Sequence, residues 1–217
     1  TPWQKERLSL CVGSLLNTGI LPNTCIGDDM RRKGSSSVRA GALQSNGEGG
    51  TPTHLVENWI KAIKDVHLDI FCISETRISY LAKHRLIEGI FRQGGYAVIS
   101  HNRGMNLPEG DPGCNSSGII LGISRKVPGG LSNVRRESNG RAIAASIPFL
   151  DASTIRVIAI YGPTATMTRR FPHTPHGPRE ERDLVAFITR EYEYALQAEI
   201  PLIVMGDFNS FPSLSLS

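Results

Sequence analysis

Apolar positions along this chain predict an alternation of strands and helices. Short apolar runs, which are typical of buried strands, lie at residues 7–16, 67–74, 96–100, 118–125, 141–149, 154–162 and 201–205. Apolar residues spaced three and four apart, which are typical of helices, lie at 55–63, 80–92 and 178–196. Strands interleaved with helices predict an α/β layered domain.

One stretch near the start breaks this pattern. Residues 27–53 are rich in glycine, serine and charged side chains, a composition that favours a flexible loop. Thr53 is the expected N-cap of the helix that follows it. The sequence therefore divides into a first-strand region at 1–26, a flexible insertion or linker at 27–53, and a domain at 54–217.

Composition narrows the class of protein. The 217 residues are 40% hydrophobic, which is enough for the core of one domain, and no apolar run is long enough to span a bilayer. The four cysteines have no Cys-x-x-Cys spacing, so they do not indicate a zinc site, and they fit a reducing compartment inside the cell. A net charge of +4 is compatible with nucleic-acid binding, although short basic pairs such as Arg135-Arg136 are ordinary in solvated loops.

Polar side chains follow three of the predicted strands. Glu75 follows the run IFCIS, Tyr161 follows VIAI, and Asp207 with Asn209 follow LIVM and a glycine. In open α/β sheets, sites form at the carboxyl ends of strands, because a strand end holds a side chain rigidly. Each residue alone has an ordinary structural explanation: Glu75 can start a helix, Tyr161 can pack at a loop, and Asp207 can close a turn. Together they supply oxygen ligands that suit Mg²⁺ or Mn²⁺.

Three segments carry a family resemblance. LDIFCISETR, VIAIYGPTA and PLIVMGDFNS together resemble the endonuclease/exonuclease/phosphatase superfamily, the fold shared by abasic-site nucleases, deoxyribonuclease I and sphingomyelinases. Three short motifs are most similar in sequence to the endonuclease domain of non-LTR retrotransposons: SETR, GRAIAA and YGP. The resemblance extends from about residue 55 to residue 212 and implies a two-layer β-sandwich flanked by helices (DNase I-like).

The resemblance also implies a reaction: Mg²⁺-dependent phosphodiester hydrolysis of DNA, of the endonuclease type. Glu75 matches the family's metal-ligand glutamate, and Tyr161 matches the tyrosine that hydrogen-bonds the scissile phosphate. Asp207 matches the aspartate that aligns or deprotonates the attacking water, and Asn209 matches the asparagine that holds a phosphate oxygen. Asn17 is the candidate for the asparagine that ends the family's first strand near the metal. These roles agree with the chemistry of the reaction. Water that attacks a phosphodiester needs a positioned base and groups that neutralise charge on the phosphoryl oxygens.

The end of the chain departs from the family pattern. The family continues past its GDFN motif to a Ser-Asp-His motif, whereas no histidine follows Asp207 here. We therefore expect a truncated copy of the domain, with a fold that is incomplete at its C-terminus and with weak or no activity. Loss of one preorganised phosphate-binding group typically lowers a rate by about 10²–10³.

Other functions stay open. A phosphatase or phospholipid phosphodiesterase of the same superfamily would use the same strand ends, and the loops that decide the substrate carry no readable signal. A non-catalytic remnant of the domain is a further alternative, and a steep loss of binding with salt would show whether it binds nucleic acid. A dinucleotide-binding fold is not favoured, because Gly13, Gly19 and Gly27 lack the G-x-G-x-x-G spacing. A retroelement origin would imply a nuclear location.

Overall fold

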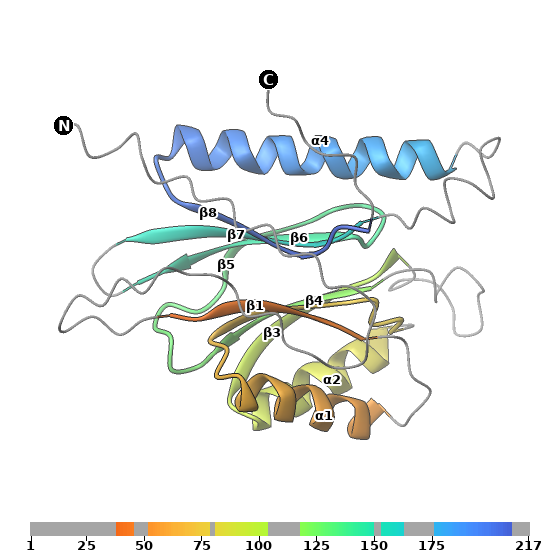
Figure 1. Ribbon diagram of the computed structural model, residues 1–217, viewed down its shortest axis with the longest axis vertical. Coiled ribbons are helices and arrows are strands. Elements are labelled where there is room, and N and C mark those ends of the chain that lie inside the picture. The colour runs from red at the N-terminus through yellow and green to blue at the C-terminus, as the bar shows by residue number, and fades with distance from the viewer. Residues whose placement is uncertain are drawn as a thin grey trace.

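Two sheets packed face to face form the centre of the molecule (Figure 1). The computed structural model describes residues 38–45, 52–78, 81–103, 118–149, 153–162 and 176–209. Within these ranges each sheet has four strands, and helices cover the outer face of both sheets (Figure 1). The predicted α/β sandwich flanked by helices is therefore confirmed.

The first sheet combines parallel and antiparallel neighbours. Its strands, in spatial order, are β1 (Ala40–Gln44), β2 (Ile70–Ser74), β4 (Ile119–Ser124) and β3 (Tyr96–His101). β1 is parallel to β2, and β4 is antiparallel to both β2 and β3. Two helices, α1 (Pro52–Asp65) and α2 (Leu81–Gln93), pack on its outer face (Figure 1). The parallel connection from β1 to β2 runs through α1, as a parallel pair requires.

The second sheet has one helix on its outer face. Its strands, in spatial order, are β5 (Ser132–Arg136), β6 (Ala142–Pro148), β7 (Thr154–Tyr161) and β8 (Leu202–Asp207). β6 is antiparallel to β5 and β7, whereas β7 and β8 are parallel, with Tyr161 opposite Asp207. The helix α4 (His176–Gln197) connects β7 to β8 and lies along the outer face of the sheet (Figure 1).

Three apolar layers explain why so many strands are continuous hydrophobic runs. On β2, Cys72 points into the layer between the sheets, and Phe71 and Ile73 point into the layer under α1 and α2. On β7, Val157 and Ile158 divide in the same way between the inner layer and the layer under α4. Both faces of these strands are buried, so a strict alternation of apolar and polar residues is not required.

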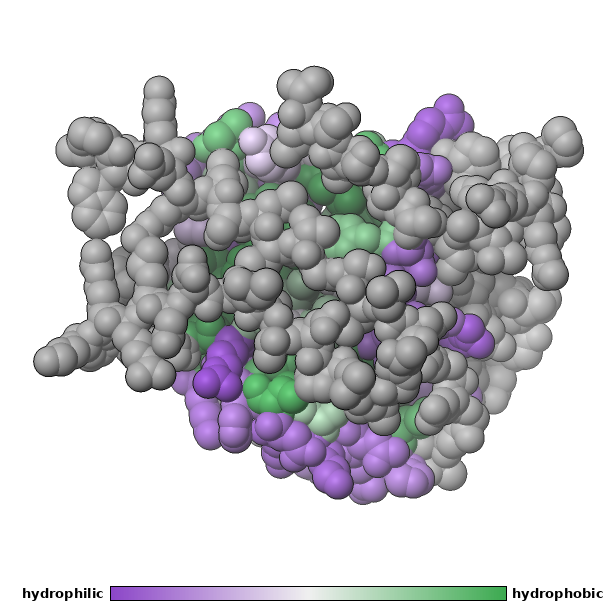
Figure 2. Space-filling model, in the orientation of Figure 1, coloured by the Kyte–Doolittle hydropathy of each residue, from purple (hydrophilic) through white to green (hydrophobic). Residues whose placement is uncertain are grey.

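The outer surfaces are polar. Figure 2 shows hydrophilic side chains gathered over α1, at the lower end of the molecule. The exposed residues of this helix include Glu57, Lys61 and Lys64, whereas Val56, Ile60 and Ile63 face the sheet and are buried. None of the helices within the described residues is long and apolar enough to cross a membrane.

The structure corrects the sequence analysis near the start of the domain. The flexible loop expected at 27–53 is wrong for residues 40–44, which form β1, because Arg39 to Gln44 pair with β2 as an ordered strand. Thr53 lies inside α1 and is not its N-cap, since the helix begins at Pro52. The strand expected at 7–16, and Asn17 after it, lie outside the described residues.

Candidate active site

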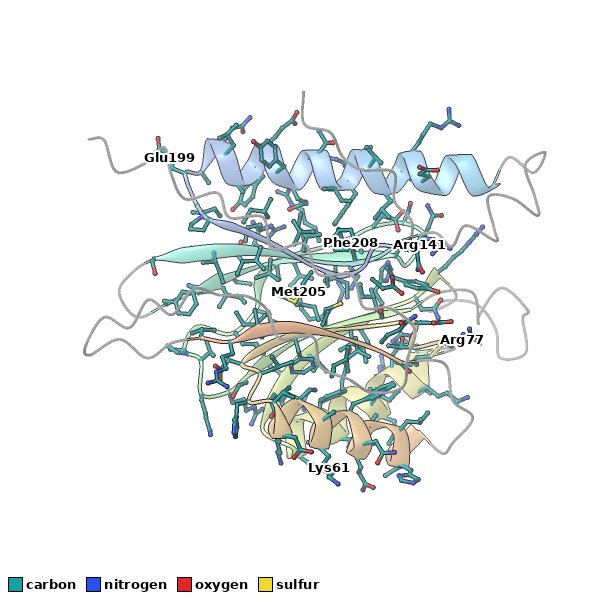
Figure 3. The ribbon with its side chains drawn as sticks, in the orientation of Figure 1. Lys61, Arg77, Arg141, Glu199, Met205 and Phe208 are labelled. Carbon is teal, nitrogen blue, oxygen red and sulfur yellow. The ribbon has the colours of Figure 1, made fainter. Side chains whose placement is uncertain are left out.

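Four strand ends meet at one edge of the sandwich. β1 and β2 run parallel in the first sheet, β7 and β8 run parallel in the second, and β8 packs against β1 and β2 across the interface. Each of these strands ends on a polar or phenolic side chain: Gln44, Ser74 followed by Glu75, Tyr161 and Asp207. Figure 3 shows Arg77 and Arg141 at this same edge, one beside each sheet. The edge therefore gathers polar groups from both halves of the fold.

Glu75 is held in place by its backbone and by two partners. Its φ of 58° is in the left-handed region, where a residue other than glycine costs about 1–3 kcal/mol, so the chain bends sharply as it leaves β2. The Gln44 side chain donates a hydrogen bond from Nε2 to Oε2 of Glu75 at 3.2 Å. Arg77 forms an ion pair with the other oxygen, Oε1. Both oxygens of this carboxylate are thus oriented by neighbours.

Asp207 is placed by the glycine before it. A Cβ at Gly206 would lie 1.9 Å from the carbonyl oxygen of Ile160, so only glycine lets β8 approach β7 this closely. The backbone N–H of Asn209 donates to Oδ1 of Asp207 at 3.0 Å. Burial raises the pKa of the Asp207 carboxyl, and the negative charge of Glu75 raises it further, although the Asn209 N–H opposes both effects.

Tyr161 lies beside Asp207 on the neighbouring strand, and its ring is almost fully buried. Burial raises the pKa of its hydroxyl to about 12, with a further contribution from the negative charge of Glu75. The guanidinium of Arg141 lies 5.4 Å from the centre of the Tyr161 ring and acts in the opposite direction on this pKa. Tyr161 is therefore a neutral hydrogen-bond donor at physiological pH.

Arg141 and Asn209 share one backbone acceptor. The carbonyl oxygen of Gly162 accepts a hydrogen bond from Nδ2 of Asn209 at 3.0 Å and from NH1 of Arg141 at 3.4 Å. Arg141 is itself buried, and its backbone N–H donates to the carboxylate of Glu137 at 3.1 Å. Arg141 thus connects the turn after β5 with the segments that carry Tyr161 and Asn209.

The structure brings four of the five residues proposed from the sequence, Glu75, Tyr161, Asp207 and Asn209, to this edge. Asn17 lies outside the described residues. Sequence reasoning missed three residues that contact them: Gln44, Arg77 and Arg141. Gln44 had no clear sequence signal, because β1 is short and consists largely of Ala and Gly. That position is the end of the strand preceding α1.

Comparison with known sequences decides the family. The sequence profile described as the endonuclease/exonuclease/phosphatase family matches residues 43–216, most of the chain. The chain belongs to this family. The match begins inside β1, so Gln44 lies at the start of the matched region. No curated protein sequence matches the chain at a significant level.

Solved structures with the same fold are remote in sequence. An AP endonuclease from Archaeoglobus fulgidus is 18% identical, with a TM-score of 0.50, and the match covers 79% of this chain and 57% of that one. A truncated TDP2 from Caenorhabditis elegans is 15% identical, with a TM-score of 0.51 and coverages of 78% and 61%. TDP2 from D. rerio, complexed with a single-strand DNA product, is 9% identical, with a TM-score of 0.50 and coverages of 78% and 60%. The chain therefore spans about three fifths of these proteins, and the likeness shows the fold.

The side chains at this edge fit a hard divalent cation. Within the described ranges no three His, Cys, Asp or Glu side chains gather into a metal site by themselves. Mg²⁺ does not need three, because it keeps several waters and uses one or two carboxylates. The carboxylate of Glu75 and the amide oxygen of Gln44 are suitable ligands. Burial raises the pKa of Asp207 and the negative charge of Glu75 adds to it, and a cation bound at Glu75 would neutralise that second contribution.

Proposed function

We propose that this chain hydrolyses phosphodiester bonds of DNA in an Mg²⁺-dependent reaction, as an endonuclease. The observation that carries the proposal is the convergence of Glu75, Tyr161 and Asp207 from two sheets at one edge. Membership of the endonuclease/exonuclease/phosphatase family supports phosphodiester chemistry. The DNA product bound to the similar TDP2 structure supports DNA as the substrate.

In this proposal Asp207 orients the attacking water and accepts its proton. Its raised pKa makes it a stronger base than an exposed aspartate. The hydrogen bond from the Asn209 N–H to Oδ1 fixes the direction of the carboxylate, so that the water is held in line with the phosphorus.

Tyr161 and Asn209 hold the phosphate group. The hydroxyl of Tyr161, with a pKa of about 12, keeps its proton and donates it in a hydrogen bond to a phosphoryl oxygen. One hydrogen of the Asn209 amide binds the carbonyl of Gly162, and the second hydrogen can point to another phosphoryl oxygen. Arg141 contacts the Tyr161 ring and shares the Gly162 carbonyl with Asn209, so it helps to hold both residues in place.

Glu75 and Gln44 would hold the Mg²⁺ ion. When bound, the ion neutralises negative charge that develops on the phosphoryl oxygens. Arg77 pairs with Glu75 through Oε1, so it must release that oxygen for a ligand bond to form there. Its freed guanidinium would then lie beside the substrate, where it can bind phosphate through two N–H groups.

Nicking of supercoiled plasmid by the purified protein tests this function. We expect slow nicking with Mg²⁺, in line with the weak activity expected from the sequence, and none with EDTA. Glu75→Ala and Asp207→Ala should each lower the rate by about 10²–10⁴, the range for removal of a catalytic base or a charge-stabilising group. Glu57→Ala, which removes an exposed carboxylate on α1, is the matched control and should nick like the wild type.

Two results would count against the proposal. One is a folded wild-type protein that does not nick DNA at any Mg²⁺ concentration, which would favour the non-catalytic remnant. The other is hydrolysis of a phospholipid or an inositol phosphate without nicking, which would favour the phosphatase and phospholipid branch of the family.

A retrotransposon origin is a second part of the proposal. It is supported by the similarity of three motifs to the endonuclease domain of non-LTR retrotransposons: SETR, GRAIAA and YGP, which contain Glu75, Arg141 and Tyr161. Sequencing the transcript beyond Ser217 tests it, because an element of this kind should continue into a reverse-transcriptase reading frame. An unrelated reading frame there would contradict the retrotransposon origin but would not affect the proposed catalytic function.

A further inference from the structure

The segment that follows β2 has a strained backbone. Glu75 and Arg77 have φ angles of 58° and 48°, and neither residue is a glycine. A residue other than glycine keeps such an angle only where its surroundings fix it. Ile78, the next residue, is buried in the layer under α1 and α2. The contacts that hold this segment therefore decide where the Glu75 carboxylate lies.

Asn102 supplies a hydrogen bond to this segment from two strands away. It follows β3, is 1% exposed, and donates from Nδ2 to the carbonyl oxygen of Ile78 at 2.8 Å. The segment also donates from the backbone N–H of Thr76 to the carbonyl oxygen of Gly118 at 3.2 Å. The Thr76 hydroxyl is buried and has no hydrogen-bond partner in the described part of the chain, so it does not hold the segment.

Gly118 leaves the space in which Asn102 and the segment meet. It directly precedes β4, which lies between β2 and β3 in the sheet. A Cβ at Gly118 would lie 2.4 Å from the Thr76 hydroxyl oxygen, 3.0 Å from the backbone nitrogen of Arg77 and 3.5 Å from Nδ2 of Asn102. Its φ of 138° also favours glycine. A side chain at this position would separate Asn102 from the segment.

The second sheet holds Asn102 from the other side. A Cβ at Gly140 would lie 2.2 Å from the backbone nitrogen of Arg103 and 2.6 Å from the carbonyl carbon of Asn102. The turn between β5 and β6 therefore packs directly on the backbone of Asn102. Next to it, Nε2 of His101 donates to the carbonyl oxygen of Glu137, in the same turn, at 2.5 Å.

The same turn leads to the Tyr161 side of the candidate site. The carboxylate of Glu137 accepts a hydrogen bond from the backbone N–H of Arg141, and the Arg141 guanidinium lies 5.4 Å from the centre of the Tyr161 ring. Figure 3 shows Arg141 and Arg77 at the same edge of the molecule, one beside each sheet. Asn102 therefore contacts the segment of Arg77 directly and the segment of Arg141 through the turn.

We propose that Asn102 is a positioning residue for the hydrolysis, because its amide keeps the segment after β2 in the conformation that presents Glu75 to the cation. The proposal rests on the proposed function. Asn102 is too buried to touch the substrate, so its effect passes through Ile78 and Arg77 to the Glu75 carboxylate. Groups that orient a metal ligand typically account for about 10–100-fold in metal affinity or activity.

Hydrogen exchange in the metal-free protein tests the contact itself. In EDTA the backbone N–H of Thr76 should exchange about tenfold faster in Asn102→Ala than in the wild type, because one hydrogen bond to the segment is lost. Ser100→Ala is the matched control, since it removes a buried polar group from β3 and should leave the Thr76 exchange rate unchanged. If Asn102→Ala does not fold, Asn102→Asp keeps the side-chain volume, places an acceptor opposite the Ile78 carbonyl, and should have the same effect.

Metal binding and turnover extend the test to the reaction. The Kd for Mg²⁺, measured from the rise in Tm, should increase by about 10–100-fold in Asn102→Ala and stay unchanged in Ser100→Ala. At saturating Mg²⁺, kcat for bis(p-nitrophenyl) phosphate should fall in Asn102→Ala while KM stays near the wild-type value, because Asn102 does not contact the substrate.

Two results would overturn the proposal. One is an unchanged Thr76 exchange rate in a folded Asn102 variant, and the other is a wild-type Kd for Mg²⁺ together with a wild-type kcat in that variant. Faster Thr76 exchange in Asn102→Ala, when the wild type neither binds Mg²⁺ nor hydrolyses the diester, would support the contact between Asn102 and the segment and reject the proposed function.

Discussion

The position of the Asp207 carboxylate makes it a better base but lowers the stability of the folded protein. It is 8% exposed and lies in the negative field of Glu75, and both features raise its pKa. An acid whose pKa is higher in the folded than in the unfolded state destabilises the folded state at pH values above that pKa. The same property makes Asp207 a better base.

Asp207→Asn should therefore stabilise the protein while it lowers activity by about 10²–10⁴. In EDTA at neutral pH we expect a higher Tm than the wild type, because the neutral amide is buried at lower cost and can still accept from the Asn209 N–H. The advantage should shrink as the pH falls through the folded pKa, and disappear below 3.8, the usual pKa of aspartate. Thermal unfolding over a pH series measures it. A variant less stable than the wild type at neutral pH would contradict the argument, and Glu57→Gln is the control at an exposed position.

A second residue, His84, should make the protein sensitive to acid. Its Nδ1 lies 2.7 Å from the hydroxyl of Ser100, and burial, assisted by the charges of His101 and Arg136, lowers its pKa from 6.5 to about 4. The unfolded chain takes up this proton first, so stability is lost as the pH falls from 6.5 to about 4. The shift corresponds to about 3 kcal/mol at the lower limit.

His84→Asn removes the titrating group and can keep a donor to Ser100. The free energy of unfolding by urea should then depend less on pH between 6.5 and 4 than in the wild type. His54→Asn, an exposed position on α1, should leave the wild-type dependence unchanged. An unaltered pH dependence in His84→Asn would assign the acid sensitivity to other groups.

At the level of single residues, the sequence predicts those that end an apolar run. Glu75, Tyr161 and Asp207 were readable because a buried strand precedes each of them. Arg141 was not, because it lies at the start of β6, and its partners Tyr161 and Gly162 come from the following strand. A contact of this kind depends on strand register, which the spacing of one sequence does not give.

At the level of elements, strands buried on both faces were predicted and strands with small or polar residues were not. β2 and β7 are long apolar runs because both faces lie in the core. β1 consists largely of Ala and Gly, so its composition does not stand out from the Gly- and Ser-rich sequence around it. β5 is an edge strand with four exposed residues of five, so it carries little apolar signal.

The helix α4 is attached to the second sheet by a buried ion pair in addition to apolar contacts. Arg156 on β7 is fully buried, and its guanidinium binds Glu191 on α4 and the backbone carbonyl of Asn133. Removing one member of such a pair leaves an uncompensated charge inside the protein and typically costs about 3–5 kcal/mol. Replacing both by apolar residues of similar size is often close to neutral.

We therefore expect Glu191→Leu and Arg156→Met each to lower the free energy of unfolding by about 3–5 kcal/mol, and the double variant to recover most of that loss. Urea unfolding followed by circular dichroism measures all four proteins. Additive losses in the double variant would show that the two side chains contribute independently. Glu193→Leu, at an exposed position of α4, is the control for the leucine substitution.

At the level of the whole molecule, the site exists only when the two sheets are packed together. Gln44 and Glu75 come from the first sheet, and Tyr161 and Asp207 come from the second. The sequence predicts each strand end separately. The way the two sheets face each other follows from the burial of the core that they share. The family resemblance supplied that arrangement, which hydrophobic periodicity alone does not specify.

A cation at this interface should stabilise the whole fold. A ligand that binds only the folded state raises the free energy of unfolding by about 2.7 kcal/mol at one hundred times its Kd. We expect Mg²⁺ and Mn²⁺ to raise the Tm of the wild type, and we expect this rise to be lost in Glu75→Gln, which removes the charged ligand. Arg77→Gln should bind the ion more tightly than the wild type, because Arg77 competes for Oε1 of Glu75.

Differential scanning fluorimetry with a metal titration measures both effects without any assay of activity. Arg92→Gln removes an exposed arginine from the last turn of α2 and should respond like the wild type. If Glu75→Gln kept the full rise in Tm, the ion would bind elsewhere in the chain. If Arg77→Gln bound the ion no more tightly, the ion pair with Glu75 would not compete with the metal, and Arg77 would have to act from its position in the metal-free protein.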